Sequence, residues 1–278
     1  MAPPEVLLAP SGADTAAVLG ARAGAPTACV AVPGAAPRAA PTTPLLQLFA
    51  EVDAAFEAER ARGQTIGAHQ APESAARLHG AIRAAFQKYV AEGHADWREM
   101  ARFCEEHYVR HLVEESANCE MILICWKKGQ ASRIHNHAQS HCWLNVLSGG
   151  VEELRFTTGD SPVEAGPTLA PRLPGVIAAT SPCPLLVSAG ISKVAPGQTA
   201  YINDSLGLHA VRCDDDACGG PGAEEGAVSL HIYAPPIRRV RLYEPEADRV
   251  VVRAPGFRTI RGVAEEEMEE ASLLSSSL

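Results

Sequence analysis

Three histidines stand where they could hold one metal ion. His135 and His137 are separated by a single residue, and His209 follows in the segment Gly207-Leu-His. In a β-strand alternate side chains share a face, so the first two imidazoles would point the same way while Asn136 points away. His209 would then complete a facial three-histidine site. Neutral imidazoles suit ferrous iron, Fe(2+), although they also suit zinc, nickel and copper, so the residues alone leave the metal open.

The segment around this pair has the composition of short strands bounded by turns. Gly129 and Gly149 mark its ends, with Val, Ile, Leu and Trp residues between them. The full spacing, Gly-x5-His-x-His-x4-Cys-x6-Gly, resembles the first motif of the cupin β-barrel, with Cys142 standing where most cupins carry a metal-binding glutamate. That departure resembles the cysteine dioxygenase family of thiol dioxygenases, which has three histidine ligands and no carboxylate.

Three further motifs extend the resemblance, in the same order along the chain. They are Tyr108-Val-Arg110, the stretch from Tyr201 to His209, and the stretch from Ser229 to Pro236. The resemblance covers roughly residues 44 to 245. It implies a mainly β fold, a cupin jelly-roll barrel with an N-terminal helical prefix. It also implies an iron-dependent enzyme that oxidises L-cysteine with O2 to cysteine sulfinate, a step of cysteine catabolism on the route to taurine and hypotaurine or sulfate.

Arg110 is the candidate for substrate recognition. A planar guanidinium binds a carboxylate through two parallel hydrogen bonds, and would therefore select an amino acid over an amine that lacks the carboxylate. Tyr108 is the matching substrate-binding hydroxyl in the family pattern. The competing interpretation is that Tyr108 and Arg110 lie at a helix end or on an edge strand, with the arginine paired at the surface.

Ser229, His231 and Tyr233 recur at every second position. A strand would present all three on one face, as a hydrogen-bond relay in which His231 holds the Tyr233 hydroxyl near the metal. The prolines that follow would end the strand. His231 is also an alternative metal ligand, but it matches a position outside the family's ligand set, so His209 is preferred.

Cys142 has two interpretations. The resemblance implies a thioether between its sulfur and the ring of Tyr233, which would fix the phenol beside the metal. The alternative is a small buried residue in a barrel strand, the commonest fate of a free cysteine. His141 is adjacent and would point to the opposite face of the strand, away from the site.

The composition limits the classes of protein to which the chain could belong. The chain has 278 residues, 46% of them hydrophobic, and a formal net charge of −9. We therefore expect neither a nucleic-acid partner nor a membrane span, because no basic cluster and no long apolar run is present. The eight cysteines lack regular spacing, which favours free thiols in a reducing compartment and hence a cytoplasmic protein. We also expect a monomer. Cys213 and Cys218 could pair or bind a soft metal, but no further partner supports this.

The chain divides into three parts. Residues 1–43 are rich in Ala and Pro and predict a disordered segment, with an organelle transit peptide as the alternative. Residues 44–262 predict a single cupin domain, with helices over 44–115 and the barrel over 121–245. Residues 263–278 predict a flexible acidic and Ser-rich tail. Within the barrel, the sequence predicts two surface insertions, residues 157–198 and 213–226.

Two alternatives to the cysteine dioxygenase reading remain. One is a thiol dioxygenase for another substrate, such as 3-mercaptopropionate or a protein with an N-terminal cysteine; such relatives commonly lack the cross-linking cysteine or the carboxylate-binding arginine. The other is a non-catalytic cupin that binds a metal or a thiol. The intact set of candidate ligands argues against the second.

Overall fold

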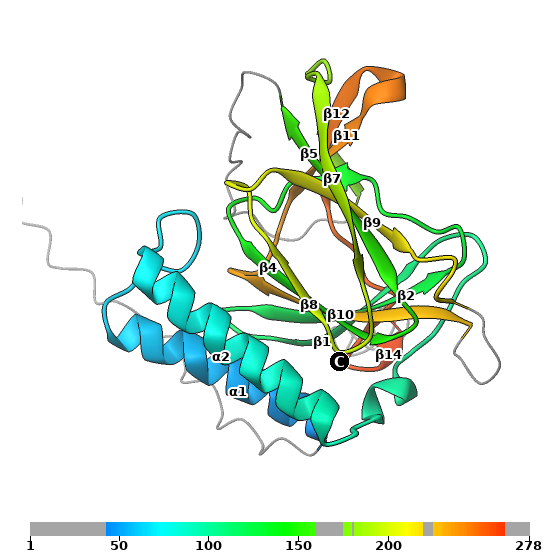
Figure 1. The fold of residues 1–278 in the computed structure, drawn as a ribbon. Helices are drawn as coiled ribbons and strands as arrows, with labels where there is room; N and C mark the ends of the chain where they lie inside the picture. Colours follow the sequence, from blue (N-terminus) through cyan, green and yellow to red (C-terminus); the bar gives the residue numbers. More distant parts are fainter. Residues whose placement is uncertain (1–42, 159–174, 180, 219–224, 265–278) are drawn as a thin grey trace, which may run out of the picture. The chain divides into compact units, whose positions relative to one another are not determined.

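The computed structural model describes residues 43–158, 175–179, 181–218 and 225–264 (Figure 1). For residues 175–179 and 264 it describes the backbone alone. The predictions for residues 1–42, for part of each proposed insertion and for the tail from residue 265 lie outside the described residues. Among the described helices, none is both long enough and apolar enough to cross a membrane.

Two helices open the described chain, α1 (Pro44–Ala61) and α2 (Pro72–Ala91). Each begins with proline in its first turn, where the missing N–H costs nothing. The Thr43 hydroxyl accepts a hydrogen bond from the backbone N–H of Leu46 and so caps α1. Gly63 and Gly93 follow the two helices with φ angles of 73° and 70°, a left-handed conformation that glycine adopts readily after the last turn of a helix.

The helical prefix is shorter than the sequence predicts. A 3-10 helix, η1 (Asp96–Glu99), is its last element, and residues Val109–Glu115 form strand β1. A run as short as Val-Arg-His-Leu-Val has no periodicity that distinguishes a helix from a strand. In the structure these residues pair with β2 and therefore form a strand. This correction places Tyr108 just before β1 and Arg110 within it.

Within the described residues, fourteen strands form two seven-stranded sheets. In order across the first sheet they are β14 (Val263–Ala264), β13 (Thr259–Ile260), β1 (Val109–Glu115), β2 (Glu120–Lys127), β10 (Gly226–Ala234), β4 (His141–Ser148) and β8 (Thr199–Ile202). The second sheet contains β6 (Gly175–Ala179), β12 (Arg249–Ala254), β11 (Val240–Glu244), β3 (Ile134–His135), β9 (Leu208–Cys213), β5 (Val151–Thr158) and β7 (Leu186–Val194). A second 3-10 helix, η2 (Pro245–Ala247), joins β11 to β12.

The central strands of the first sheet are buried on both faces. One face packs against α1 and α2, which lie side by side along it in Figure 1, and contributes Met121, Leu123, Trp143, Leu230 and Ile232 to a common core with the helices. The other face contributes Ile122, Ile124, Leu144 and Val146 to a second core with residues of the second sheet, among them Val151 and Val211. Strand β10 is accordingly buried at every position. The mainly β prediction with a helical prefix is confirmed.

The prediction of a surface insertion over residues 157–198 is wrong in part. Strand β7 pairs with β5 from Val151↔Val194 to Thr158↔Leu186, and β6 pairs with β12. Both strands are therefore part of the second sheet and not an appendage to it.

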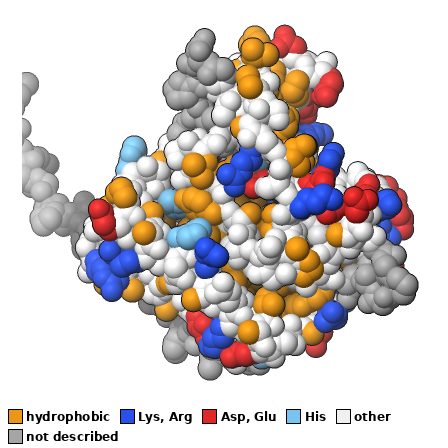
Figure 2. Space-filling view, in the orientation of Figure 1, with side chains coloured by type: hydrophobic (Ala, Val, Ile, Leu, Met, Phe, Trp, Pro, Cys, Tyr) orange, Lys and Arg blue, Asp and Glu red, His pale blue; other side chains and the backbone are white. Residues whose placement is uncertain are grey.

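Figure 2 shows acidic and basic side chains intermixed over the face in view, with apolar side chains between them.

Candidate metal centre and substrate cavity

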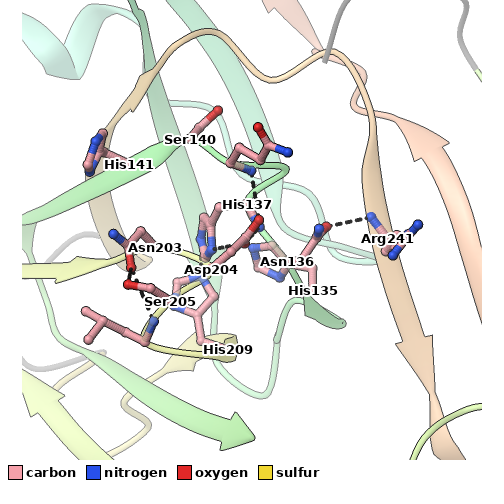
Figure 3. Close-up of polar contacts among 12 residues, drawn as sticks. His135, Asn136, His137, Ser140, His141, Asn203, Asp204, Ser205, His209 and Arg241 are labelled. Atoms are coloured by element: carbon pink, nitrogen blue, oxygen red, sulfur yellow. Dashed lines mark hydrogen bonds and ion pairs between the residues drawn. The ribbon is translucent and has the colours of Figure 1, made fainter. Parts of the chain in front are cut away.

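The three histidines meet between strands that are distant in sequence. His135 on β3 and His209 on β9 are direct cross-strand partners, and His137 lies two residues beyond His135, just after the strand. Figure 3 shows the three side chains directed toward one another. One ligating nitrogen from each lies within 4.8 Å of the others, and the Nε2 atoms of His137 and His209 are 3.1 Å apart. Ligands at right angles around a metal about 2.1 Å away would be about 3 Å apart.

All three imidazoles are held in the neutral form that a metal requires. Burial lowers the pKa of His135 to about 4 and lowers the pKa values of His137 and His209 well below the ordinary value. Neutral imidazoles keep a lone pair for the metal even in mildly acidic solution. The chemistry and spacing of the donor set therefore fit a bound metal ion.

Hydrogen bonds direct the ring nitrogens. Nδ1 of His135 lies 2.8 Å from the carbonyl oxygen of Arg133, and Nδ1 of His209 lies 2.9 Å from Oε1 of Glu153. Each Nδ1 therefore carries the proton and donates it outward, which leaves Nε2 free to bind the metal. Asp204 holds the turn that carries His137, because its carboxylate accepts the backbone N–H groups of His137 and Gln139 at 2.6 and 2.7 Å (Figure 3).

Glu153 is a supporting residue that sequence reasoning missed. Its side chain is 2% exposed, and it lies on β5 opposite Val211 of β9. Arg155 donates hydrogen bonds to Oε2 of Glu153 at 3.0 and 2.9 Å, which compensates for the buried carboxylate. The sequence contains a sign that Glu153 is buried. It lies two residues after the apolar Val151, and residues two apart on a strand share a face.

A cavity of about 860 Å³ opens beside the histidines. Both sheets contribute to its wall. The described lining residues with polar or aromatic side chains include Tyr108, Arg110, Trp126, His135, His209, His231, Tyr233, Arg253 and Phe257. Tyr108, Arg110, His231 and Tyr233 thus share one space with two of the three candidate metal ligands. Ser229, which the resemblance also implies as a substrate-binding residue, is fully buried and is not among the lining residues.

Arg110 reaches this cavity from β1. It lies opposite Ile124 of β2, which in turn lies opposite Ser229 of β10, so the three side chains share the face toward the second sheet. The guanidinium carbon is 5.3 Å from the centre of the Phe257 ring, and the buried Nε has no hydrogen-bond partner. A buried donor of this kind is costly unless a ligand satisfies it.

Ser229, His231 and Tyr233 form a connected chain of hydrogen bonds. Oγ of Ser229 is 2.9 Å from Nε2 of His231, and the Tyr233 hydroxyl is 3.3 Å from Nδ1 of the same ring. The indole N–H of Trp126 donates to Ser229 Oγ at 2.8 Å, and the Tyr108 ring stacks on Trp126 with centroids 4.6 Å apart. Burial lowers the pKa of His231 to about 3, so the ring is neutral near pH 7. The arrangement has the geometry of the predicted relay.

Cys142 and Tyr233 are direct cross-strand partners on β4 and β10. The Cys142 side chain is fully buried and that of Tyr233 is 6% exposed. Burial raises the pKa of the Cys142 thiol, and a hydrogen bond with Tyr233 partly opposes the increase. The two side chains are therefore in contact, as a covalent bond between them would require.

Other candidates fall outside this site. His141 faces the helices, with Nδ1 2.6 Å from the Tyr201 hydroxyl, and lies apart from the three histidines in Figure 3. Cys213 and Cys218 are both free thiols. Within the described residues, the second group of side chains close enough to share a metal ion is Cys104, Glu106 and His107, in a loop at the mouth of the cavity.

The fold and the site define a class of protein, a two-sheet β protein in which three clustered histidines could hold a metal ion beside a cavity. The profile of the family "Cysteine dioxygenase type I" matches residues 79–246, a range that holds every candidate ligand and every cavity residue predicted from the sequence. The chain belongs to the cysteine dioxygenase type I family.

Two curated relatives illustrate the similarity. Cysteine dioxygenase type 1 of Danio rerio is 35% identical over 150 residues, which cover 54% of this chain and 62% of the relative. The protein of the same name from Rattus norvegicus is 30% identical over 156 residues, 56% of this chain and 64% of the relative. Both matches span less than two thirds of the relatives' length. A crystal structure of an RmlC-like cupin protein from Desulfovibrio desulfuricans aligns at 20% identity over 52% of this chain and 97% of that chain, with a TM-score of 0.30.

Proposed function

We propose that the protein is a cysteine dioxygenase that binds ferrous iron and oxidises L-cysteine with O2 to cysteine sulfinate. One observation carries the proposal. In a member of this family, two of the three neutral histidines, His135 and His209, line the same cavity as the Arg110 guanidinium, whose buried Nε has no hydrogen-bond partner among the described residues. The histidines suit a metal ion that binds a thiolate, and the guanidinium suits a carboxylate. L-Cysteine carries both groups on one small skeleton.

Arg110 binds the carboxylate of the substrate. Its Nε is buried without a partner, so a bidentate carboxylate would satisfy a donor that is otherwise costly to bury. Phe257 lies under the guanidinium and restricts its movement. The Tyr108 hydroxyl, fixed by the stacking of its ring on Trp126, lines the same cavity and completes the carboxylate site.

The relay orients the sulfur end of the substrate. Ser229 Oγ accepts a hydrogen bond from the indole of Trp126 and lies 2.9 Å from Nε2 of His231, and Nδ1 of the same ring lies 3.3 Å from the Tyr233 hydroxyl, so this chain of contacts fixes the position of the phenol. The phenolic oxygen then keeps lone pairs to accept a proton or hydrogen bond from the thiol. A thioether to Cys142 would hold the phenol in this position permanently.

Iron bound by His135, His137 and His209 would supply the redox chemistry that activates O2 and a Lewis-acidic position for the thiolate. The protein groups bind the carboxylate, keep the sulfur oriented and exclude water from the buried relay. Both oxygen atoms of O2 end on the cysteine sulfur, so the overall reaction needs no further reductant.

Oxygen consumption tests the proposal. Iron-loaded protein is offered L-cysteine, cysteamine and 3-mercaptopropionate side by side, and the sulfinate product is identified by mass; metal-free protein is the control. We expect rapid uptake with L-cysteine alone, because cysteamine lacks the carboxylate. A preference for 3-mercaptopropionate would overturn the assignment of L-cysteine as the substrate. No oxygen uptake with any of the thiols would favour a non-catalytic metal-binding cupin.

The proposal includes a cytoplasmic, monomeric protein. Seven cysteines in the described residues are free, which agrees with a reducing compartment. The molar mass of the purified protein, measured by light scattering, tests whether it is a monomer.

A further inference from the structure

A second cluster of metal-ligating side chains lies at the mouth of the cavity. Cys104, Glu106 and His107 belong to the loop between η1 and β1, and one ligand atom of each lies within 4.8 Å of the others. Glu106 and His107 are exposed and line the cavity, and Cys104 is half-buried in the same loop. The oxidation of L-cysteine proposed above uses none of the three side chains, so their grouping needs another explanation.

The distances within this cluster are close to those of a tetrahedral metal site. Sγ of Cys104 lies 3.7 Å from Nδ1 of His107. With Zn–S bonds of about 2.3 Å and Zn–N bonds of about 2.1 Å, tetrahedral angles place these two atoms about 3.6 Å apart. The same sulfur donates a hydrogen bond to Oε2 of Glu106 at 2.7 Å. A cation that replaces the thiol proton would therefore find the carboxylate beside it, and the exposed Glu106 side chain can rotate to widen this contact.

The donor set and the local charge both favour a thiophilic divalent cation. Thiolate, imidazole and carboxylate are the protein ligands of Zn²⁺, and the thiolate selects against hard cations such as Mg²⁺. With the thiol deprotonated and the imidazole neutral, the cluster carries two negative charges, which match a divalent ion. Among the described residues Glu106 has no ion-pair partner, because the nearby Lys127 ammonium pairs with Glu105 and, at 2.9 Å, with Glu225.

Contacts outside the cluster hold the loop in place. The side-chain amide of Gln130 donates hydrogen bonds to the carbonyl oxygens of Cys104 and Glu105 at 2.8 and 3.3 Å. The Glu105 carboxylate pairs with Lys127, so it does not compete for the Cys104 thiol. Because the backbone is ordered by these contacts, less conformational entropy is lost when a ligand binds.

We infer that Cys104, Glu106 and His107 bind a thiophilic divalent cation of the Zn²⁺ class at the mouth of the cavity. Three protein ligands leave the fourth tetrahedral position open to water or a small thiol. His107 directly precedes Tyr108, which lines the cavity, so a bound ion would fix the segment that leads into the substrate site. The inference requires neither iron nor the oxidation of L-cysteine.

Anaerobic titration of the iron-loaded protein with Co²⁺ tests this site, because a cobalt–thiolate bond gives a strong charge-transfer absorption in the near ultraviolet. The three-histidine centre has no thiolate ligand, so cobalt that replaces iron there adds no such band. We expect a saturable band that disappears when Zn²⁺, the tighter-binding ion, is added. Cys104→Ser should abolish the band. Cys183→Ser is the control and should keep it, since Cys183 is another half-buried free thiol.

Two neighbouring variants separate ligation from the overall charge of the loop. Glu106→Gln and Glu105→Gln each remove one negative charge with little change in the size of the side chain. Glu106→Gln and His107→Gln should weaken Co²⁺ binding at least about tenfold, because loss of an outer partner of a ligand already costs about 10- to 100-fold. Glu105→Gln should leave the affinity nearly unchanged, since Glu105 pairs with Lys127 and not with the cluster.

Absence of the band, or its persistence in Cys104→Ser, would overturn the inference. An equal loss of affinity in Glu105→Gln and Glu106→Gln would also overturn it, because the effect would then reflect overall charge and not ligation. Each result is read from metal binding in the absence of O2. The test is therefore independent of whether the protein oxidises L-cysteine.

Discussion

Cys142 and Tyr233 face one another across the β4/β10 pair, in register and on the cavity side of the first sheet. The same row continues to Ile202 on β8 and to Glu120 on β2. Directly opposed side chains in an antiparallel pair have β-carbons about 4.5–5.5 Å apart. No strand movement is needed to bring the sulfur to the phenol ring, so the register itself provides the geometry for a thioether.

The thioether gives the first prediction. Protein prepared with iron, O2 and L-cysteine should run as two bands on a denaturing gel, cross-linked and not, and Cys142→Ser should leave one band while retaining iron. Cys125→Ser is the matched control, since Cys125 is also buried but lies in the core with the helices. Two bands in Cys142→Ser would place the cross-link at another cysteine.

The second prediction concerns the shape of the cation at position 110. Arg110→Lys keeps the charge but loses the planar fork, so we expect the KM for L-cysteine to rise about 10- to 100-fold, corresponding to one or two lost charged hydrogen bonds. Iron content should be unchanged, because Arg110 is not among the histidine ligands. Steady-state kinetics together with iron analysis measures both. An unchanged KM would remove Arg110 from the carboxylate site.

Glu153 supports the third prediction. Its carboxylate accepts the Nδ1 proton of His209, and loss of such an outer partner typically lowers metal affinity about 10- to 100-fold. Glu153→Ala should therefore release iron to a chelator at lower concentration than the unmodified protein. Glu152→Ala is the control, because Glu152 faces the opposite side of β5 and pairs with Arg212. Equal iron retention in the two variants would contradict the supporting role.

The fourth prediction is a pH dependence of stability. Burial lowers the pKa of His135 to about 4 and that of His231 to about 3, whereas both titrate near 6.5 in the unfolded chain. Between these values the unfolded state binds more protons than the folded state, so folding stability rises with pH over that window and falls as the solution is acidified below about 6.5. Each group contributes at most about 1.4 kcal/mol per pH unit.

Urea unfolding of the metal-free protein at pH values from 7 to 4 measures this slope. His231→Gln removes one of the titrating groups, so its stability should fall less steeply with acid than that of the unmodified protein. A slope that is identical in the two proteins would show that His231 is not buried in its neutral form.

Local patterns in the sequence predicted those parts of the site that depend on strand periodicity. Ser229, His231 and Tyr233 share a face because β10 is a continuous strand, and their hydrogen bonds follow from that alternation. The same rule places His141 on the face away from the metal. The boundary between helix and strand does not follow from local patterns. The sequence predicts a helical prefix through residue 115, whereas Val109–Glu115 form β1, because a run of seven residues carries too little periodicity to distinguish the two.

The sequence predicts the mainly β class and the three candidate histidines from short motifs, and the resemblance of those motifs to a known family implies the cysteine–tyrosine pair. The distant residues that support these side chains became visible only in the folded chain. Glu153 reaches His209 through the register of β5 and β9, and Arg253 reaches the cavity through the register of β12 and β11. Such contacts depend on which strands pair and in what register, and a single sequence contains no local pattern that specifies either.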